Sequence, residues 1–306
     1  MGRKKKKNHS SILVLLVFII IIGLAFFGYK KITKSQNNNN DSTEAIQQAQ
    51  SENTTNEETT PSEEAVAKEK PSPVASLTAE EITQSKKRGL PVLMYHFFYD
   101  AQAGQTGKDA NYIEIHDFEE QIKYLADNDY YVPTWDEVLG YVKGENGLPL
   151  KSVVITVDDG DPSFFELAAP VLEKYNIRAT SFLITSWYTW TIDHTTYYPY
   201  VDFQSHSQDM HRSGSDGKGR IMTIPHADGV KDLETSRATI NDTVTVFCYP
   251  FGHYNDHAKQ ILKDANFTLA FTVEYGRVFP GQDPLVLPRI RMQKGDSLQT
   301  FIKKVE

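Results

Sequence analysis

The chain has 306 residues and a single cysteine, Cys248. One cysteine excludes an intrachain disulfide and a cysteine-rich zinc module. Basic side chains are scarce in most of the chain, because residues 88–306 carry 20 basic and 30 acidic residues, a net charge of −10. Nucleic-acid binding requires a basic face that neutralises phosphates, so we expect none. Nothing in the sequence points to a protein partner.

Long hydrophobic segments are limited to one, Ile12–Tyr29, which has 18 residues and no charge. A helix of that length nearly spans the hydrocarbon core of a bilayer, about 30 Å. Five basic residues precede it and three follow, which places residues 1–11 in the cytoplasm as a short tail and the rest outside. Because no small-residue cleavage site follows, we predict an uncleaved transmembrane anchor over 12–29; a cleaved signal peptide is the alternative.

Residues 30–87 are polar, acidic and poor in aromatic residues. Such a segment cannot bury enough apolar surface to offset the entropy lost on ordering. We therefore predict a disordered linker over 30–87, followed by one folded domain over 88–306.

Strand patterns and helix patterns alternate through residues 88–306, which is typical of an α/β domain with a parallel sheet, open or closed into a barrel. The predicted strands are Leu90–Tyr95, Ser152–Val157, Ala179–Thr185, Val244–Tyr249, Leu269–Val273 and Leu285–Met292. In either architecture, functional residues gather at the carboxyl ends of the strands.

Two adjacent carboxylates, Asp158 and Asp159, end the most apolar of these strands. Like charges this close oppose joint ionisation. One interpretation is that both cap a helix beginning near Pro162. The other is that one carboxylate binds a cation while the second acts beside it.

Two histidines, His206 and His211, lie five residues apart in the segment FQSHSQDMH. Two imidazoles and one carboxylate suffice to hold a catalytic Zn²⁺ with a position left for water. Two surface histidines on a polar loop are the alternative, which the neighbouring aspartate pair makes less attractive. A third feature, the turn Cys248–Gly252, ends another strand and can aim backbone N–H groups into a site.

The segments LMYH, TVDDG, HSQDMH and YPFG occur in this order. Together they resemble the NodB-type polysaccharide deacetylases of carbohydrate esterase family 4. The five-residue histidine spacing, with LMYH at the start of the domain, resembles the branch that contains poly-N-acetylglucosamine deacetylases. The resemblance implies a deformed (β/α)7 barrel and a divalent metal, for which we expect Zn²⁺.

The resemblance also implies roles for individual residues. Asp159, His206 and His211 match the family's metal ligands, and Asp158 matches its general base. A general base takes a proton from the attacking water. The oxyanion that then forms at the attacked carbonyl needs a hydrogen-bond donor. We expect that donor to be the backbone N–H of Phe251.

Two departures from the family pattern affect these roles. Cys248 stands where the family has an arginine that braces the base. Arg289 or Arg291, both unusual in an otherwise apolar strand, can fill that space, and we select Arg289; surface exposure is the alternative for Arg291. The family's C-terminal histidine, its general acid, is absent, and His96 at the end of the first strand is the replacement we predict.

Aromatic residues are concentrated between residues 183 and 206. Flat aromatic faces suit stacking on sugars, although packing at the end of a barrel is an equal alternative. We assign substrate binding to Trp187 and Trp190, and also to Tyr249 and Pro250 of the turn.

These inferences predict a membrane-anchored, extracellular, metal-dependent hydrolase that removes N-acetyl groups from N-acetylglucosamine units of a cell-envelope glycan. The substrate is peptidoglycan or a polysaccharide attached to the wall, including its linkage sugar. A catalytically inactive glycan-binding domain and an O-acetyl esterase are the alternatives. A glycosidase is disfavoured, because adjacent aspartates cannot flank one glycosidic bond at about 5–9 Å.

Overall fold

A computed structural model describes residues 72–187 and 198–306. The predicted cytoplasmic tail and anchor, and the linker up to residue 71, lie outside the described residues. Within the described ranges, no helix is both long and apolar enough to cross a membrane.

Seven strands form a closed barrel in the order β1-β4-β5-β6-β7-β8-β9. Each strand is parallel to its neighbours, including β9 to β1, where Leu93 pairs with Ile290. The predicted (β/α)7 barrel is therefore confirmed. The strands are β1 (Val92–Tyr95), β4 (Val154–Val157), β5 (Ala179–Leu183), β6 (Val201–Ser205), β7 (Val246–Cys248), β8 (Leu269–Tyr275) and β9 (Leu287–Arg291). A separate parallel pair consists of β2 (Phe97–Tyr99) and β3 (Tyr112–Glu114).

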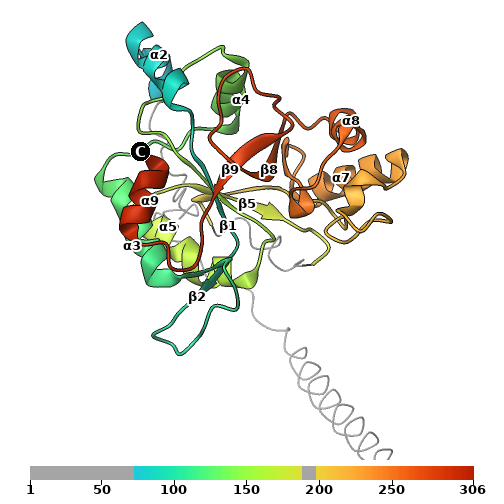
Figure 1. Cartoon of the computed structure of the whole chain (residues 1–306), viewed down its shortest axis with the longest axis horizontal. Helices are drawn as coiled ribbons and strands as arrows, with labels where there is room; N and C mark the ends of the chain where they lie inside the picture. The colour runs from blue at the N-terminus through green and yellow to red at the C-terminus, as the bar shows by residue number, and fades with distance from the viewer. Residues whose placement is uncertain (1–71, 188–197) are drawn as a thin grey trace, which may run out of the picture. The chain divides into compact units, whose positions relative to one another are not determined.

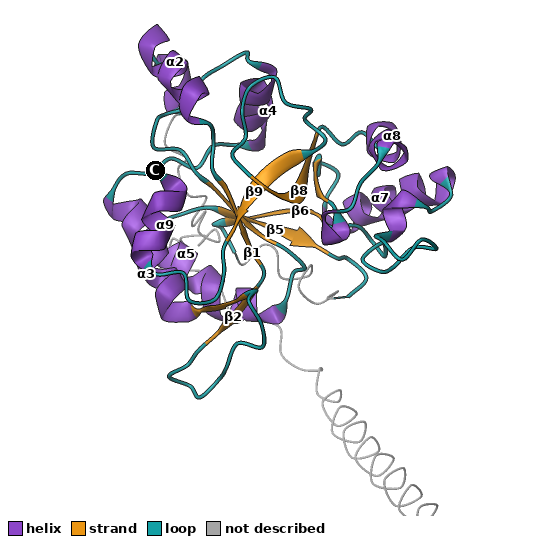
Figure 2. Cartoon of the chain, in the orientation of Figure 1, coloured by secondary structure: helices purple, strands orange, loops and turns teal. Residues whose placement is uncertain are grey.

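Helices surround the barrel (Figure 2). In Figure 1, α3, α5 and α9 lie together on one side, and α7 and α8 lie on the other. The helices are α2 (Ala79–Arg88), α3 (Ile115–Asp127), α4 (Trp135–Lys143), α5 (Ala169–Tyr175), α7 (His226–Ile240), α8 (Asp256–Asp264) and α9 (Leu298–Val305). Shorter helical turns are η1 (Pro73–Ser76), η2 (Phe164–Ala168, a π-helix that precedes α5), η4 (Arg220–Met222) and η5 (Pro250–Gly252).

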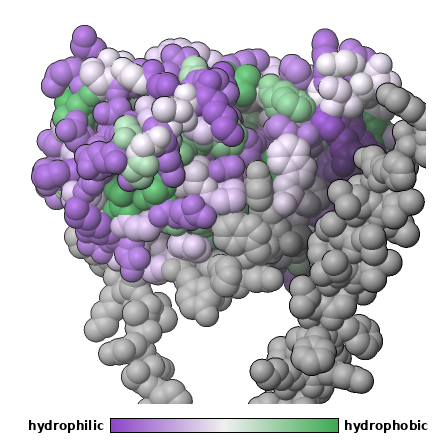
Figure 3. Space-filling view, turned by 90° about the horizontal axis from the view of Figure 1, so that it is seen from below, coloured by the Kyte–Doolittle hydropathy of each residue, from purple (hydrophilic) through white to green (hydrophobic). Residues whose placement is uncertain are grey.

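The surface drawn in Figure 3 is mainly hydrophilic. Among the coloured residues of that view, hydrophobic ones form small separate patches rather than one continuous area. This mixed surface agrees with the strongly acidic composition of residues 88–306.

Alternation along each strand decides which side chains enter the barrel, because successive residues of a strand point to opposite faces. Inside the barrel, Arg289 of β9 contacts both Thr156 of β4 and Cys248 of β7. Tyr249 follows Cys248 and therefore points outward, where it packs against Phe247 and Tyr254. The polar inward positions give the barrel a polar end.

Strand β6 was not predicted. Its inward-facing residues are polar, so it lacks an apolar run. Gln204 accepts the backbone N–H groups of Thr245 and Val246, and its amide donates to Asp202. Asp202 also accepts the indole N–H of Trp135 at 2.8 Å. These bonds satisfy the polar groups of β6 inside the barrel. A strand stabilised in this way is not detected by a pattern of alternating hydrophobic residues.

The prediction that the disordered linker extends to residue 87 is wrong for its last part, which forms η1 and α2. Helix α2 begins with a capping box between Thr78 and Glu81. Its buried Ser85 accepts the N–H of Leu148, and the Ser85 carbonyl accepts the hydroxyl of Tyr141. These contacts with the domain offset the entropy that the segment loses on ordering. Its polar composition alone would not offset that loss.

Candidate active site

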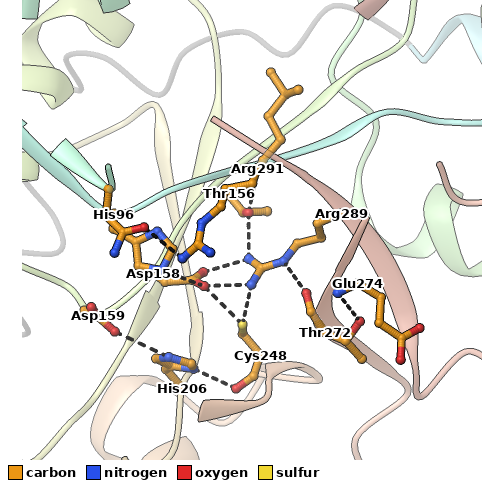
Figure 4. Close-up of polar contacts among 12 residues, drawn as sticks. His96, Thr156, Asp158, Asp159, His206, Cys248, Thr272, Glu274, Arg289 and Arg291 are labelled. Carbon is orange, nitrogen blue, oxygen red and sulfur yellow. Dashed lines mark hydrogen bonds and ion pairs between the residues drawn. The ribbon is translucent and has the colours of Figure 1, made fainter. Parts of the chain in front are cut away.

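The carboxyl ends of β1, β4, β6 and β9 bring the predicted site residues together (Figure 4). His96 follows β1, Asp158 and Asp159 follow β4, and His206 follows β6. Asp158, His206 and Arg289 have exposed fractions of 2%, 2% and 0%. Charged groups this deeply buried require partners, so their contacts define the site.

Asp159, His206 and His211 converge on one point. Asp159 Oδ1 lies 3.4 Å from His206 Nε2 and 3.5 Å from His211 Nε2. All three ligand atoms lie within 4.8 Å of one another. A charge-assisted hydrogen bond is shorter, about 2.7–2.9 Å. Ligands about 2.0–2.2 Å from a tetrahedral zinc ion lie about 3.3–3.5 Å apart, which fits these separations.

The Asp159 carboxylate supports the same reading. Its Oδ1 atom is buried, and within the described residues no donor makes a hydrogen bond to it. The backbone of Asp159 has φ of +76°, a left-handed conformation that is strained for a residue other than glycine. An acceptor held in this way fits a cation. The role of the three residues as metal ligands remains a prediction.

Contacts behind the histidines orient them. His206 Nδ1 lies 2.7 Å from the Cys248 carbonyl oxygen, to which it donates, so Nε2 is the ring nitrogen that faces Asp159. Burial, helped by the nearby His206, lowers the pKa of His211 to about 4. A neutral imidazole is the form that binds a metal. Asp232 accepts the N–H groups of residues 208 and 209 and so fixes the loop between the two histidines.

Arg289 forms a two-pronged ion pair with Asp158. Nη1 donates to Oδ1 and Nη2 to Oδ2, each at 2.7 Å. Burial by itself raises the pKa of Asp158, but the Arg289 guanidinium, with smaller contributions from His96 and His206, outweighs it, and the net pKa lies well below the usual range. Asp158 is therefore ionised at neutral pH. Arg291, the other candidate, instead donates to Asn111 Oδ1 at 2.8 Å.

His96 lies on the other side of Asp158. Its Nε2 is 3.8 Å from Asp158 Oδ2, so the two groups face the same space. Burial lowers the pKa of His96, although Asp158 and Asp159 oppose this effect. His96 is therefore neutral at pH 7 until it gains a proton from a neighbour.

Aromatic side chains line the site at His211. The Phe251 ring lies 4.3 Å from the His211 ring, and the Trp187 ring lies 5.1 Å from it. Both aromatic residues are exposed, with fractions of 43% and 48%. Phe251 has φ of +61° and Gly252 φ of +72°, left-handed conformations of the turn that carries the Phe251 ring to His211. Trp190 lies outside the described residues.

Two of the predicted substrate-binding residues have no exposed side chain. The side chains of Tyr249 and Pro250 are buried, so neither presents a face to a sugar. For Tyr249 the reason is strand alternation, because Cys248 occupies the inward position and Tyr249 packs outward against helical residues.

Several contributing residues were missed from the sequence. Thr156 and Thr272 accept N–H groups of Arg289, the first through its hydroxyl and the second through its carbonyl. Asp232 lies in helix α7 and follows His211 by 21 residues in the sequence. A threonine inside each apolar strand was an available signal for the first two, but no local pattern marks Asp232.

Comparisons with known proteins identify sequences that are similar to this chain. A family model described as polysaccharide deacetylase matches residues 145–270. A poly-beta-1,6-N-acetyl-D-glucosamine N-deacetylase of Staphylococcus aureus (strain MRSA252) is 30% identical over 203 residues, which are 61% of this chain and 69% of that protein.

Two solved structures share the fold. IcaB from Ammonifex degensii has a TM-score of 0.60 and 25% identity, over 71% of this chain and 97% of that one. The Streptococcus pyogenes deacetylase PplD, in complex with acetate, has a TM-score of 0.61 and 22% identity, over 71% of this chain and 98% of that one.

Proposed function

This chain belongs to the polysaccharide deacetylase family, and from that premise we propose that it is a metal-dependent enzyme that removes N-acetyl groups from N-acetylglucosamine units of a cell-envelope polysaccharide. The observation that carries the proposal is the pairing of an ionised, arginine-bound Asp158 with an adjacent Asp159 that faces two imidazoles.

The substrate we propose is a polymer of N-acetylglucosamine. The similar staphylococcal protein is named for poly-β-1,6-N-acetyl-D-glucosamine, which favours such a polymer over peptidoglycan. The exposed rings of Trp187 and Phe251 beside His211 offer flat faces to a sugar.

Zinc is the metal we propose, because two imidazole nitrogens and one carboxylate form a common catalytic zinc set. Asp159, His206 and His211 would hold it. When bound, zinc supplies a Lewis acid that polarises a carbonyl and lowers the pKa of water to about 7.

The residues of the chain then divide the proton transfers. Asp158, which Arg289 keeps ionised, accepts a proton from the water that attacks the acetamide carbonyl. The Phe251 N–H donates to the carbonyl oxygen as it becomes negative. His96, 3.8 Å from Asp158, takes up the proton that Asp158 removed from water and delivers it to the departing amine nitrogen. The products are acetate and a glycan with a free, positively charged amine.

The inactive-domain alternative loses its main support. It was motivated by the missing arginine and the missing C-terminal histidine, and the barrel supplies Arg289 and His96 beside Asp158. We also propose that the domain acts outside the cell, attached through residues 12–29. The uncharged run and the excess of basic residues before it support this topology.

The test uses the full chain, purified in detergent and loaded with zinc, and measures acetate release from poly-β-1,6-N-acetylglucosamine oligomers and from acetylated xylan. We expect release from the first substrate and a loss of at least about 100-fold in Asp158→Asn, because the base is removed. Release from xylan alone would favour the esterase. No release from either substrate, or equal rates for the variant, would contradict the proposed reaction.

A further inference from the structure

Arg289 is fully buried, and its five N–H groups each have an acceptor. Four acceptors are oxygens: the Thr272 carbonyl, the Thr156 hydroxyl and the two carboxylate oxygens of Asp158. The fifth is the sulfur of Cys248, 2.9 Å from Nη2. Each Nη atom carries two hydrogens. Without the sulfur, one Nη2 hydrogen of this buried cation would have no acceptor among the groups named above.

Cys248 has two further contacts in the same site (Figure 4). Its S–H donates to Asp158 Oδ2 at 3.4 Å. Its carbonyl accepts from His206 Nδ1 at 2.7 Å. One residue therefore touches the base, the arginine that holds the base, and a predicted metal ligand.

The backbone around Cys248 is held in place. Cys248 pairs with Phe271 in the parallel ladder between β7 and β8, and the following N–H, that of Tyr249, donates to the Phe271 carbonyl. The Cys248 side chain is completely buried. The sulfur thus occupies a buried position against both Asp158 and Arg289.

We propose that the Cys248 thiol is a positioning residue for the general base. It completes the hydrogen bonding of Arg289 and restrains the Oδ2 side of Asp158, so that the carboxylate keeps one orientation towards the attacking water. The thiol does not contact substrate and acts only through Asp158. This inference rests on the proposed function, in which Asp158 is the base.

The discriminating pair is Cys248→Ser and Cys248→Ala, in the full zinc-loaded chain with N-acetylglucosamine oligomers as substrate. Serine keeps a donor and an acceptor, so kcat should stay within about threefold of wild type. Alanine leaves a buried donor unsatisfied, so kcat should fall about 10- to 100-fold. KM and zinc content should be unchanged in both, because substrate and ligand contacts remain.

Val246→Ala is the matched control, since Val246 is a buried residue of the same strand and makes no polar contact through its side chain. We expect this variant to be less stable but to keep kcat within twofold. An equal loss of kcat in Val246→Ala and Cys248→Ala would show that loosening of β7 explains the effect, and would overturn the proposal. So would Cys248→Ala with wild-type kcat, or Cys248→Ser as slow as Cys248→Ala.

A second readout does not depend on activity. In ¹⁵N spectra of arginine-labelled protein, the Arg289 Nη2 protons should be protected from exchange in wild type and Cys248→Ser, and lose protection in Cys248→Ala. If wild type releases no acetate, the proposed function fails and this spectrum alone decides the role of the sulfur. Unchanged protection of these protons in Cys248→Ala would overturn the proposed role of the sulfur.

Discussion

The ion pair between Arg289 and Asp158 offers the sharpest test of how this site is built. Replacing Arg289 by leucine removes the cation and leaves the Asp158 carboxylate buried, with 2% of its surface exposed. Breaking a buried pair by removing one partner costs about 3–5 kcal/mol. Because a typical domain is stable by about 5–15 kcal/mol, Arg289→Leu should still fold, with much reduced stability.

The converse change, Asp158→Asn, leaves the guanidinium of Arg289 buried without its counter-charge, so it should also be destabilising. The double variant contains neither buried charge. We therefore expect it to be more stable than either single variant, which requires a coupling energy larger than the cost of Arg289→Leu, at least about 3 kcal/mol.

Urea unfolding followed by tryptophan fluorescence measures these differences, provided that the m-value is unchanged between variants. Arg291→Leu is the matched control, because it removes an arginine two residues along the same strand that bonds Asn111 rather than Asp158. It should cost less than about 1 kcal/mol. A loss below 1 kcal/mol in Arg289→Leu, or a double variant as unstable as the sum of the singles, would refute the reasoning.

Three further predictions concern other parts of the domain. Zinc at 100 times its Kd should stabilise the domain by about 2.7 kcal/mol, which corresponds to a Tm increase of about 5–10 °C. His211→Ala should abolish this increase. An equal increase in the variant would argue against the predicted ligand set. Burial raises the pKa of Asp202, so its ionisation opposes folding as pH rises above about 3.9, the ordinary value. Asp202→Asn should therefore be more stable than wild type at pH 7 and equal to it near pH 3, as measured by urea unfolding at both values; a gain that is largest at acid pH would contradict this sign. At Gly252, φ is +72° and an added Cβ would lie 2.4 Å from Val273 Cγ2, so Gly252→Ala should lose at least about 1–2 kcal/mol and lower kcat by moving Phe251. Adding Val273→Ala should restore part of both, and no recovery would indicate that backbone conformation alone is responsible.

The sequence by itself determined the architecture and most of the candidate site. Apolar strands alternating with helices predicted a parallel sheet, open or closed, because a strand buried on both faces needs a continuous apolar run. The family resemblance implied that the sheet closes into a barrel. The ordered motifs identified Asp158, Asp159, His206 and His211, and a charge inside an apolar strand drew attention to Arg289. These signals are local, so each can be read from a few neighbouring residues.

The tertiary structure alone decided which residues meet. Strand β6 escaped detection because its inward side chains have polar partners from distant segments rather than apolar ones: Asp202 accepts the Trp135 indole, and Gln204 accepts backbone N–H groups of β7 and the residue before it. Helix α2 was assigned to the linker because its stability comes from contacts of Ser85 with the domain. Closure of the barrel also placed Cys248 against an arginine 41 residues further along the chain. Such partners are set by the pairing and inward alternation of strands, and no short stretch of sequence encodes them.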